Sequence, residues 1–494
     1  MATKTQTVTV TGTDGKDYEV TLTAEGSITV NSVTPLDNGN VVPPEPPDGG
    51  GGDLPTDVTL QAIDGGPSYY ADNGFTHAAT AGWDKPSFFP ISIFLEKCIN
   101  QDHANKWKDI KANLMVSGQA SDTTLKVLRD NGIYLFAQAV ELDKILANNN
   151  NGALGSETVG INAYDEPGTY AQCIGALQSV ANTHQDQRLF YENFTWNQLA
   201  YGDVERHMMD DLYNDMIATP NGSKRHLDLA SVDIYWMAGD NGPDGGAYNS
   251  GLLYQRDMLS RDERRRGARY GDMIDWIARG NPICQHPKWQ SDYPAPVAVF
   301  VETGGPYTEN NTVASYSQPP EINAAVWSTL IHGARHVQYF SHTFGSAGGG
   351  GTLLFNDFYK QPYPGQSISV YDQVKATNTQ IASLATVLNS PFAIGFVTVS
   401  PEGWKFGDPA LSAFKGDGFD VMAKLHNVAG GDNAFYVFCM PRYSPALQDQ
   451  TATFTVKSGT TATVVGENRS IPISGGRFTD KFKDGHTVHI YKIG

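Results

Sequence analysis

The chain has 494 residues, a hydrophobic content of 40% and a formal charge of −18 at pH 7. This length predicts roughly two to four domains, and the acidic balance argues against a basic surface for nucleic acid. No run approaches the roughly 18 apolar residues of a membrane helix, so we expect no membrane insertion.

The N-terminus lacks the apolar core of a signal peptide. The four cysteines, Cys98, Cys173, Cys284 and Cys439, are scattered and form no C-x-x-C pair. A disulfide or zinc framework would show closer spacing, so we expect buried reduced thiols. No metal or other cofactor is expected either, because the glycine run at 348–351 lacks the Lys-Ser/Thr of a phosphate-binding loop.

Residues 1–40 alternate between polar and β-branched side chains around an Asp14-Gly15 turn, which predicts a small β module. Residues 41–56 are rich in proline and then glycine, as in a linker. So small a sheet buries little surface by itself. We therefore expect residues 1–40 to be an attachment module that contacts an assembly partner or forms a homo-oligomer.

Residues 57–389 contain eight apolar runs of strand length, several followed by helix signals. Apolar strands that alternate with helices are typical of a parallel sheet covered by helices. We predict a (β/α)8 TIM barrel; an open doubly wound sheet is the alternative, but its glycine-rich phosphate turn is missing. The predicted strands are 88–95, 113–117, 134–139, 159–164, 188–194, 230–236, 297–301 and 336–342.

Two insertions interrupt the predicted barrel. Residues 237–296 contain a basic run at 261–266, which we interpret as a solvated helix face because acidic residues accompany it. Residues 345–368 are expected to form a flap near the barrel mouth. From residue 390 to residue 494 the pattern changes to short alternating strands without helices, which predicts a C-terminal β-sandwich.

Two predicted strands end in carboxylates. The run 159–164 leads directly into Asp165-Glu166, and the run 297–301 leads into Glu302. The C-terminal ends of barrel strands form the catalytic face. Glycosidic bond cleavage needs two carboxyl groups, one as an acid and one as a nucleophile or base. Adjacent Asp165 and Glu166 repel one another, which raises at least one pKa and suits a general acid.

Aromatic residues gather near the same predicted strand ends and would stack on sugar rings. We predict that substrate is bound by Asp165 together with a set of aromatic residues and a histidine: Tyr164, Trp196, Tyr235, Trp236, Tyr339 and His342. Each aromatic is as readily explained as core or rim packing, and only the group favours a carbohydrate cleft. His332, His336 and His342 are not expected to converge on a metal.

Residues 55–494 resemble the clan A glycoside hydrolases through Asp165-Glu166-Pro167, Val301-Glu302-Thr303-Gly304 and the closing β-strands. The resemblance implies a barrel with the acid/base at Glu166, the nucleophile at Glu302 and a tyrosine, Tyr235, beside the nucleophile. Asp165 stands where the family usually has asparagine. No arginine lies between residues 54 and 127, where the family's strand-two arginine would be.

We therefore predict a glycoside hydrolase that cleaves a cell-surface polysaccharide with retention. The alternative is an inactive barrel that binds glycans or serves as a structural virion component, and a hydrolase of another envelope bond is a third hypothesis. The tethered β module is similar to those of phage tail-associated proteins, which implies a virion location and tail-protein partners for residues 1–40. The sugar, the linkage and the oligomeric state do not follow from the sequence.

Overall fold

A computed structural model describes residues 4–11, 17–24, 28–35, 54–118, 121–141, 156–167, 169–183, 187–195, 227–237, 262, 265–279, 296–303, 307–309, 312–315, 317–341, 352–406 and 417–494. The chain divides into two compact units, Met1–Gly51 and Gly52–Gly494. The first unit contains strands β1 (Lys4–Thr11), β2 (Asp17–Ala24) and β3 (Ile28–Pro35). They form an antiparallel sheet in the order β1-β2-β3. The predicted Asp14-Gly15 turn lies outside the described residues.

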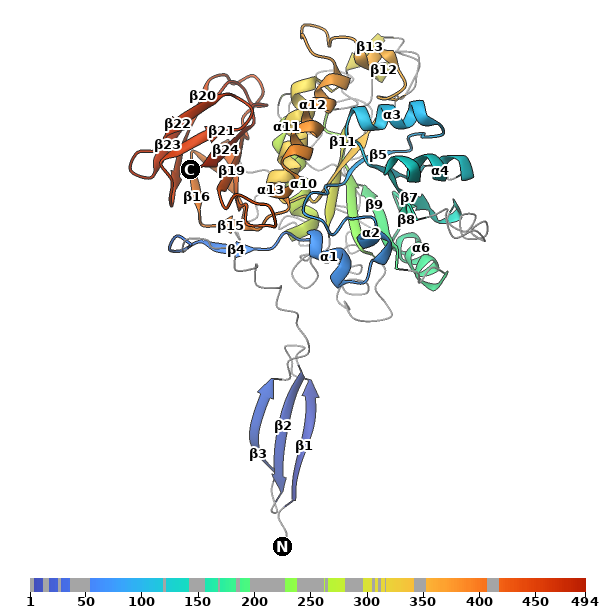
Figure 1. The fold of residues 1–494 in the computed structure, drawn as a ribbon, viewed down its shortest axis with the longest axis vertical. Helices are drawn as coiled ribbons and strands as arrows, with labels where there is room; N and C mark the ends of the chain where they lie inside the picture. Colours follow the sequence, from blue (N-terminus) through green and yellow to red (C-terminus); the bar gives the residue numbers. More distant parts are fainter. Residues whose placement is uncertain are drawn as a thin grey trace. The chain divides into compact units, whose positions relative to one another are not determined.

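The second unit contains a closed barrel of eight parallel strands, which confirms the predicted fold class (Figure 1). Their order around the barrel is β10-β11-β14-β5-β6-β7-β8-β9. Each strand lies within or close to one of the predicted apolar runs. The strands are β5 (Ile91–Phe94), β6 (Leu114–Val116), β7 (Tyr134–Gln138), β8 (Thr158–Asp165), β9 (Leu189–Thr195), β10 (Leu229–Asp233), β11 (Val297–Glu302) and β14 (His336–Phe340).

Burial explains why these runs become barrel strands. Every residue of β5, β10, β11 and β14 is buried, because one side of a barrel strand faces the interior and the other faces the surrounding helices. The interior also contains polar side chains: the Tyr191 hydroxyl lies 2.6 Å from Oγ of Ser231 and accepts a 2.9 Å hydrogen bond from Nε2 of Gln338. These contacts satisfy groups that would otherwise be costly to bury.

Helices surround the barrel, and their ends follow local capping chemistry. In α4 (Asp122–Asn131) the Ser121 hydroxyl accepts a 3.2 Å hydrogen bond from the Thr124 N–H, and Gly132 closes the helix in the left-handed conformation. The other helices are α1 (Pro67–Asp72), α2 (Thr76–Thr80), α3 (Gln101–Asp109), α6 (Tyr170–Thr183), α10 (Ala268–Arg279), α11 (Pro319–Ile331), η3 (Asp357–Lys360), α12 (Val370–Ser383) and α13 (Ala385–Leu388).

Two antiparallel sheets pack together after the barrel, consistent with the predicted C-terminal β-sandwich. One has the strand order β22-β21-β24-β19-β18-β15-β4, with β17 added in parallel beside β18, and the other has the order β16-β20-β23. A separate hairpin, β12 (Tyr307–Glu309) and β13 (Thr312–Ser315), follows β11. The sandwich strands after the barrel are β15 (Phe392–Ile394), β16 (Val397–Ser400), β17 (Glu402–Lys405), β18 (Phe419–Leu425), β19 (Phe435–Pro441), β20 (Gln450–Val456), β21 (Thr461–Val464), β22 (Arg469–Pro472), β23 (Arg477–Phe482) and β24 (His489–Ile493).

The edge strand β4 (Thr59–Gln61) precedes the barrel in sequence but pairs with β15 of the C-terminal sheet. The segment just before the barrel and the segment just after it therefore pair with each other in one sheet of the sandwich. The predicted boundary at residue 57 assigned β4 to the barrel; the domain boundaries remain a prediction.

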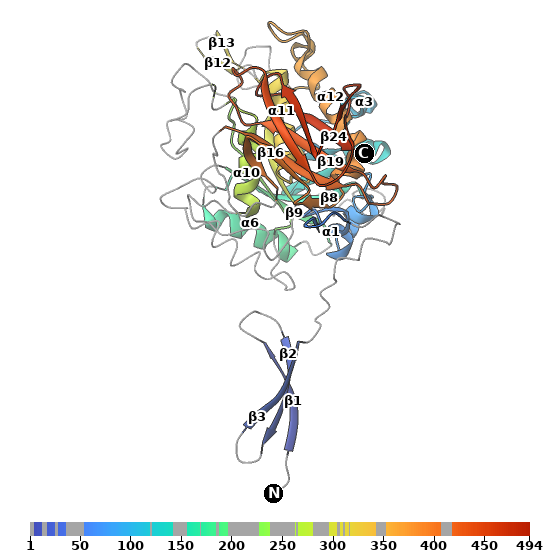
Figure 2. The same ribbon diagram turned by 90° about the vertical axis from the view of Figure 1, so that its left-hand side faces the viewer.

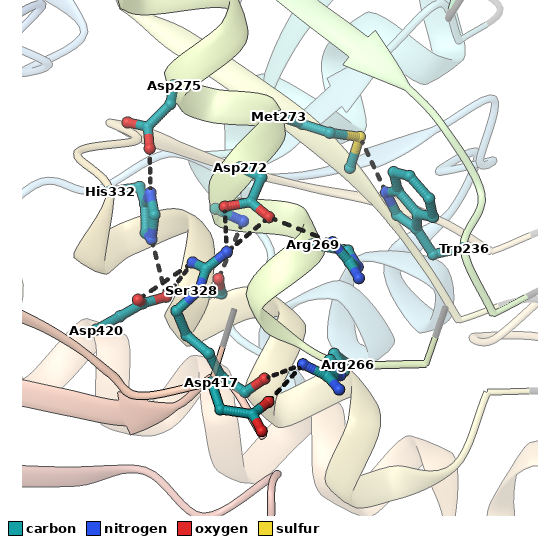
Figure 3. A network of polar contacts seen from close by, with 12 residues as sticks. Trp236, Arg266, Arg269, Asp272, Met273, Asp275, Ser328, His332, Asp417 and Asp420 are labelled. Carbon is teal, nitrogen blue, oxygen red and sulfur yellow. Dashed lines mark hydrogen bonds and ion pairs between the residues drawn. The ribbon is translucent and has the colours of Figure 1, made fainter. Parts of the chain in front are cut away.

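The sandwich lies against α10 and α11, as the two ribbon views show (Figures 1 and 2). A buried network of charges occupies this junction (Figure 3). Arg442 donates to both carboxylate oxygens of Asp272 at 2.8 and 2.9 Å and to those of Asp420 at 3.1 and 3.0 Å. His332 lies between Asp275 (2.8 Å) and Asp420 (3.1 Å). The barrel and the sandwich are thus joined by ion pairs as well as by apolar contacts.

Candidate active site

The carboxyl ends of three barrel strands carry acidic side chains. Strand β8 ends at Asp165 and is followed by Glu166, β10 ends at Asp233, and β11 ends at Glu302. All eight strands are parallel, so these ends lie at the same end of the barrel. In barrels of this type that end forms the catalytic face.

Asp165 and Glu166 both have exposed side chains. The surrounding protein still removes enough water from the Asp165 carboxyl to raise its pKa to about 6; the Asn193 amide lowers this pKa and the Glu166 charge raises it. Nδ2 of Asn193 donates a 3.1 Å hydrogen bond to Oδ1 of Asp165. A carboxyl with this pKa is partly protonated near neutral pH and is suited to proton transfer.

The backbone of Glu166 adopts a φ of +54°, a left-handed conformation that few residues other than glycine adopt. Its N–H donates a 3.0 Å hydrogen bond to the carbonyl oxygen of Asn193, which anchors this turn on β9. Such strained conformations often occur at functional sites. The side chain of Glu166 is exposed.

Asp233 is a third carboxyl at this end of the barrel, and the sequence analysis did not propose it as a site residue. Its side chain is 6% exposed. Burial raises its pKa well above the usual range, and the neighbouring carboxyls of Glu166 and Asp165 raise it further. The signal was visible in the sequence, since Asp233 interrupts the apolar run 230–236 much as Glu302 follows the run 297–301.

Glu302 is completely buried, at 0% exposure. Its Oε1 accepts a 2.8 Å hydrogen bond from the backbone N–H of Met237, which follows β10. The hydroxyl of Tyr235, the residue predicted to lie beside the nucleophile, donates to Oδ2 of Asp233 at 3.3 Å. The loop after β10 therefore contacts both Asp233 and Glu302.

The predicted aromatic residues occupy different environments. Tyr164 is 38% exposed, and Tyr235 is half-buried, with its ring centroid 5.0 Å from that of Phe340. Trp236 is buried and its Nε1 lies 3.3 Å from Sδ of Met273. Tyr339 is also buried and donates a 2.6 Å hydrogen bond to Oδ1 of Asn378. The last two rings fill the core, and Trp196 and His342 lie outside the described residues.

Two further acidic residues with raised pKa values, one just after a barrel strand and one on a strand, were missed by the sequence analysis. Glu96 follows β5, and burial raises its pKa to about 7 although its Oε1 accepts a 2.9 Å hydrogen bond from the Lys97 N–H. Glu192 on β9 is buried beside the Cys173 thiol, 3.1 Å from its Oε2, and burial raises its pKa well above the usual range. Glu96 directly follows the predicted run 88–95, so the rule that marked Glu302 would also have marked it, whereas Glu192 lies inside the run 188–194.

The two described histidines that were considered as metal ligands have separate environments. His332 belongs to the charge network at the junction. His336 is buried in the barrel near Phe136, and burial together with the Arg335 charge lowers its pKa to about 3. Among the described residues, no group of three or more His, Cys, Asp or Glu side chains is arranged to hold a metal ion. Nor does the described part of the chain contain a helix long and apolar enough to cross a membrane.

A cleft of about 740 Å³ lies elsewhere, between the start of α11, residues 365–368 and the sandwich. The ion pair of Arg265 and Glu321, at 2.5 and 2.6 Å, forms part of its wall. The strand-end carboxyls are not among its described lining residues. The cleft is therefore separate from the candidate active site.

Comparison with models of protein families found no match, and comparison with curated proteins found none either. Solved structures similar to this chain include a glucosidase from Croceicoccus marinus, with 10% identity, a TM-score of 0.40 and coverage of 79% of this chain and 91% of that chain. A glycoside hydrolase family 5 structure from Bacteroides vulgatus has 11% identity, a TM-score of 0.37 and coverage of 82% and 89%. Similarities this low assign neither a family nor an activity.

Proposed function

We propose that the mouth of the barrel is the active site of a glycoside hydrolase that cleaves a polysaccharide. The observation that carries this proposal is that β8, β10 and β11 each end in a carboxyl residue at the same end of the barrel. Carboxyl groups of different protonation state are what glycosidic cleavage requires. Burial raises the pKa of Asp165 to about 6 and that of Asp233 well above its usual range, which supports a site that can hold a proton near neutral pH.

The mechanism assigns the acid/base role to Glu166 and the nucleophile role to Glu302. In the first step Glu166 gives its proton to the glycosidic oxygen as the bond between that oxygen and the anomeric carbon breaks. A carboxylate oxygen of Glu302 bonds to the same carbon. In the second step a water molecule gives a proton to Glu166, and its oxygen displaces Glu302. Two displacements return the anomeric carbon to its original configuration.

Exposed apolar side chains near the carboxyls are suited to the faces of sugar rings. Leu95, Val140 and Tyr164 are 44%, 59% and 38% exposed, and each lies at or just beyond the carboxyl end of a barrel strand. Tyr164 immediately precedes the two acidic residues of β8. A tyrosine in this position can stack on a sugar while its hydroxyl remains in water.

A barrel that binds a glycan without cleaving it is the second candidate, and the burial of Glu302 favours it. A nucleophile must touch the anomeric carbon, whereas Glu302 has no exposed surface and its Oε1 is bonded to the Met237 N–H. For catalysis, the loop after β10 has to move away from Glu302 when substrate binds. In a binding protein the hydrogen bond between the Met237 N–H and Glu302 would persist and stabilise the barrel mouth.

Replacing each predicted catalytic carboxyl separates these candidates. We expect Glu302→Gln and Glu166→Gln each to lower kcat by at least about 100-fold, with little loss of affinity for the same polysaccharide. Released reducing ends report turnover, and the first anomer formed, followed by NMR, reports retention. Glu402→Gln, an exposed carboxyl of the sandwich paired with Lys405, is the control. Binding without release of reducing ends by the unmodified chain would support the second candidate.

We further propose that residues 1–40 attach the chain to a larger assembly, such as the tail of a phage virion, or to other copies of itself. The small size of the sheet β1-β2-β3 supports this role, because a three-stranded sheet gains stability when a partner covers it. The full chain should then form oligomers in light scattering, or bind tail proteins, and deletion of residues 1–40 should abolish the association while leaving hydrolysis unchanged. Equal association by both chains would reject the proposal.

A further inference from the structure

Two lysine ammonium groups contact the same aromatic ring at the rim of the barrel. Nζ of Lys97 lies 4.9 Å from the centroid of the Phe355 ring, and Nζ of Lys106 lies 4.7 Å from it. The His103 ring also packs on Phe355, with 4.5 Å between the centroids. Because a cation is attracted to the face of an aromatic ring, Phe355 holds both charges in one place.

These four residues, here called the rim cluster, come from three segments at the carboxyl end of β5. Lys97 follows β5, His103 and Lys106 lie on α3, and Phe355 precedes η3. Nε1 of Trp107 on α3 donates a 3.1 Å hydrogen bond to the carbonyl oxygen of Lys97. The loop that carries Lys97 is therefore fastened to the helix that carries Lys106.

The two ammonium groups lack a carboxylate partner. Neither Lys97 nor Lys106 forms an ion pair with any residue that the structure describes, whereas Lys375 on α12 pairs with Asp109 of α3 at 2.6 Å. Both lysines act on the Glu96 carboxyl, but burial raises its pKa to about 7 in spite of them. Glu96 is therefore only partly ionised near neutral pH, and the rim cluster keeps a net positive charge.

The rim cluster lies two strands away from Glu302. Phe340 of β14 is paired with Glu302 of β11, and the Phe340 ring centroid is 6.2 Å from that of Phe94, the last residue of β5. Neighbouring strands lie about 4.8 Å apart, so the end of β5 is roughly 10 Å from Glu302 along the barrel wall. A polymer whose scissile bond lies at Glu302 extends beyond this distance, and a neighbouring sugar can reach Lys97.

We propose that the rim cluster binds the carboxylate or sulfate groups of an acidic polysaccharide, with Lys97 and Lys106 as the binding residues. The inference rests on the proposed function and names the class of its substrate. An ammonium group offers three donors on a mobile stem, and its hydrogen bonds to anionic oxygens are strengthened by charge. In a chain with a net charge of −18, these lysines attract an anionic polymer that most of the surface repels.

The charge preference can be measured on the full chain with pairs of oligosaccharides that differ only in charge. One pair is an oligogalacturonate and its methyl ester, and the other is a sulfated dextran oligosaccharide and its unsulfated parent. In calorimetric titrations at about 50 mM NaCl, we expect a charged probe to bind about 10-fold more tightly than its neutral partner. The pair that shows the preference distinguishes carboxylate from sulfate recognition. Equal affinities within both pairs, or no binding of either charged probe, would overturn the proposal.

Substitution of the two lysines assigns the preference to the rim cluster. The variant with both Lys97→Gln and Lys106→Gln should bind the charged and neutral probes equally, and a retained preference would overturn the proposal. Lys85→Gln is the matched control, because Lys85 is also exposed and precedes β5 at the opposite end of the barrel. If the double variant does not fold, Lys97→Gln alone should lose part of the preference, since Lys97 is exposed; an unchanged preference would contradict the proposal.

Turnover distinguishes a failure of this inference from a failure of the proposed hydrolase. Binding of a charged probe through the two lysines without release of reducing ends would contradict hydrolysis and leave this inference standing. Cleavage of a neutral polysaccharide with the same kcat/KM in the double variant would contradict this inference and leave hydrolysis standing. Where an acidic polysaccharide is cleaved, the double variant should raise KM about 10-fold and change kcat by less than about 2-fold, because the lysines bind away from the reacting bond.

Discussion

Gly160 on β8 shows how little space the barrel has for an added atom. A Cβ at this position would lie 2.5 and 2.6 Å from two ring carbons of Phe136 and 3.1 Å from the carbonyl oxygen of Leu189. Phe136 is completely buried, so its ring cannot rotate into solvent. We expect Gly160→Ala to lower the free energy of unfolding by about 1–3 kcal/mol, measured by urea denaturation.

Gly175 on α6 is the matched control for this substitution. It is exposed, and an added Cβ would have no atom within 4 Å. Because alanine favours a helix over glycine, Gly175→Ala should leave stability unchanged or raise it by up to about 1 kcal/mol. Equal effects of the two substitutions would show that strand packing at Gly160 is not limiting.

The positions of individual candidate residues on the fold could be predicted where the pattern of the chain marked them. Glu302 and the pair Asp165-Glu166 follow apolar runs directly, and all three lie at the carboxyl ends of barrel strands. The sequence could not show that Glu302 is buried beneath Met237, because that contact depends on the loop after another strand. Asp233 could be found only by considering carboxylates that lie inside an apolar run as well as those that follow one.

At the scale of elements, the eight barrel strands followed from composition because each is an apolar run that ends at a turn. The ends of α4 (Asp122–Asn131) are also set locally, since Ser121 and Gly132 are capping signals that act within one turn of the chain. Strand β4 did not follow from composition, because a segment of three residues becomes a strand only through its pairing with β15. Local patterns specify elements that are stable through their own burial, and pairing partners specify the rest.

The same limit applied to the basic run at 261–266, which the sequence analysis interpreted as a solvated face. Arg265 is buried and forms a bidentate ion pair with Glu321 at the start of α11. Arg266 donates to Asp417 at 3.0 Å and to the carbonyl oxygen of Arg442 at 2.9 Å. That interpretation is wrong for these two residues. Their partners lie in later parts of the chain, and no charge pattern within the run reveals them.

At the scale of the whole second unit, stability depends on charges buried between the barrel and the sandwich (Figure 3). Arg442 and His332 together contact three aspartates: Asp272, Asp275 and Asp420. The attraction offsets the desolvation of these groups only while the full set is present, and removal of one partner typically costs 3–5 kcal/mol. His332 is the member of the set that titrates in an accessible range.

The protonation of His332 predicts that the chain loses stability in mildly alkaline solution. Burial alone would lower the pKa of His332, but the carboxylates of Asp275 and Asp420 outweigh burial and raise it to about 9. The Trp404 ring, stacked at 3.7 Å between centroids, also favours the cation. The stabilising contribution is therefore complete below the unfolded pKa of about 6.5 and is lost as the pH rises through about 9.

We expect the free energy of unfolding of the full chain to fall by roughly 3 kcal/mol between pH 6.5 and pH 9.5, measured by urea denaturation. His332→Gln should be less stable at pH 6.5 and should lose most of this dependence, because its amide carries no charge at either pH. Asp275→Asn should retain part of the dependence through Asp420. A fall of the same size in His332→Gln would show that another group titrates, and the junction would then owe its stability to Arg442 and its two aspartates alone.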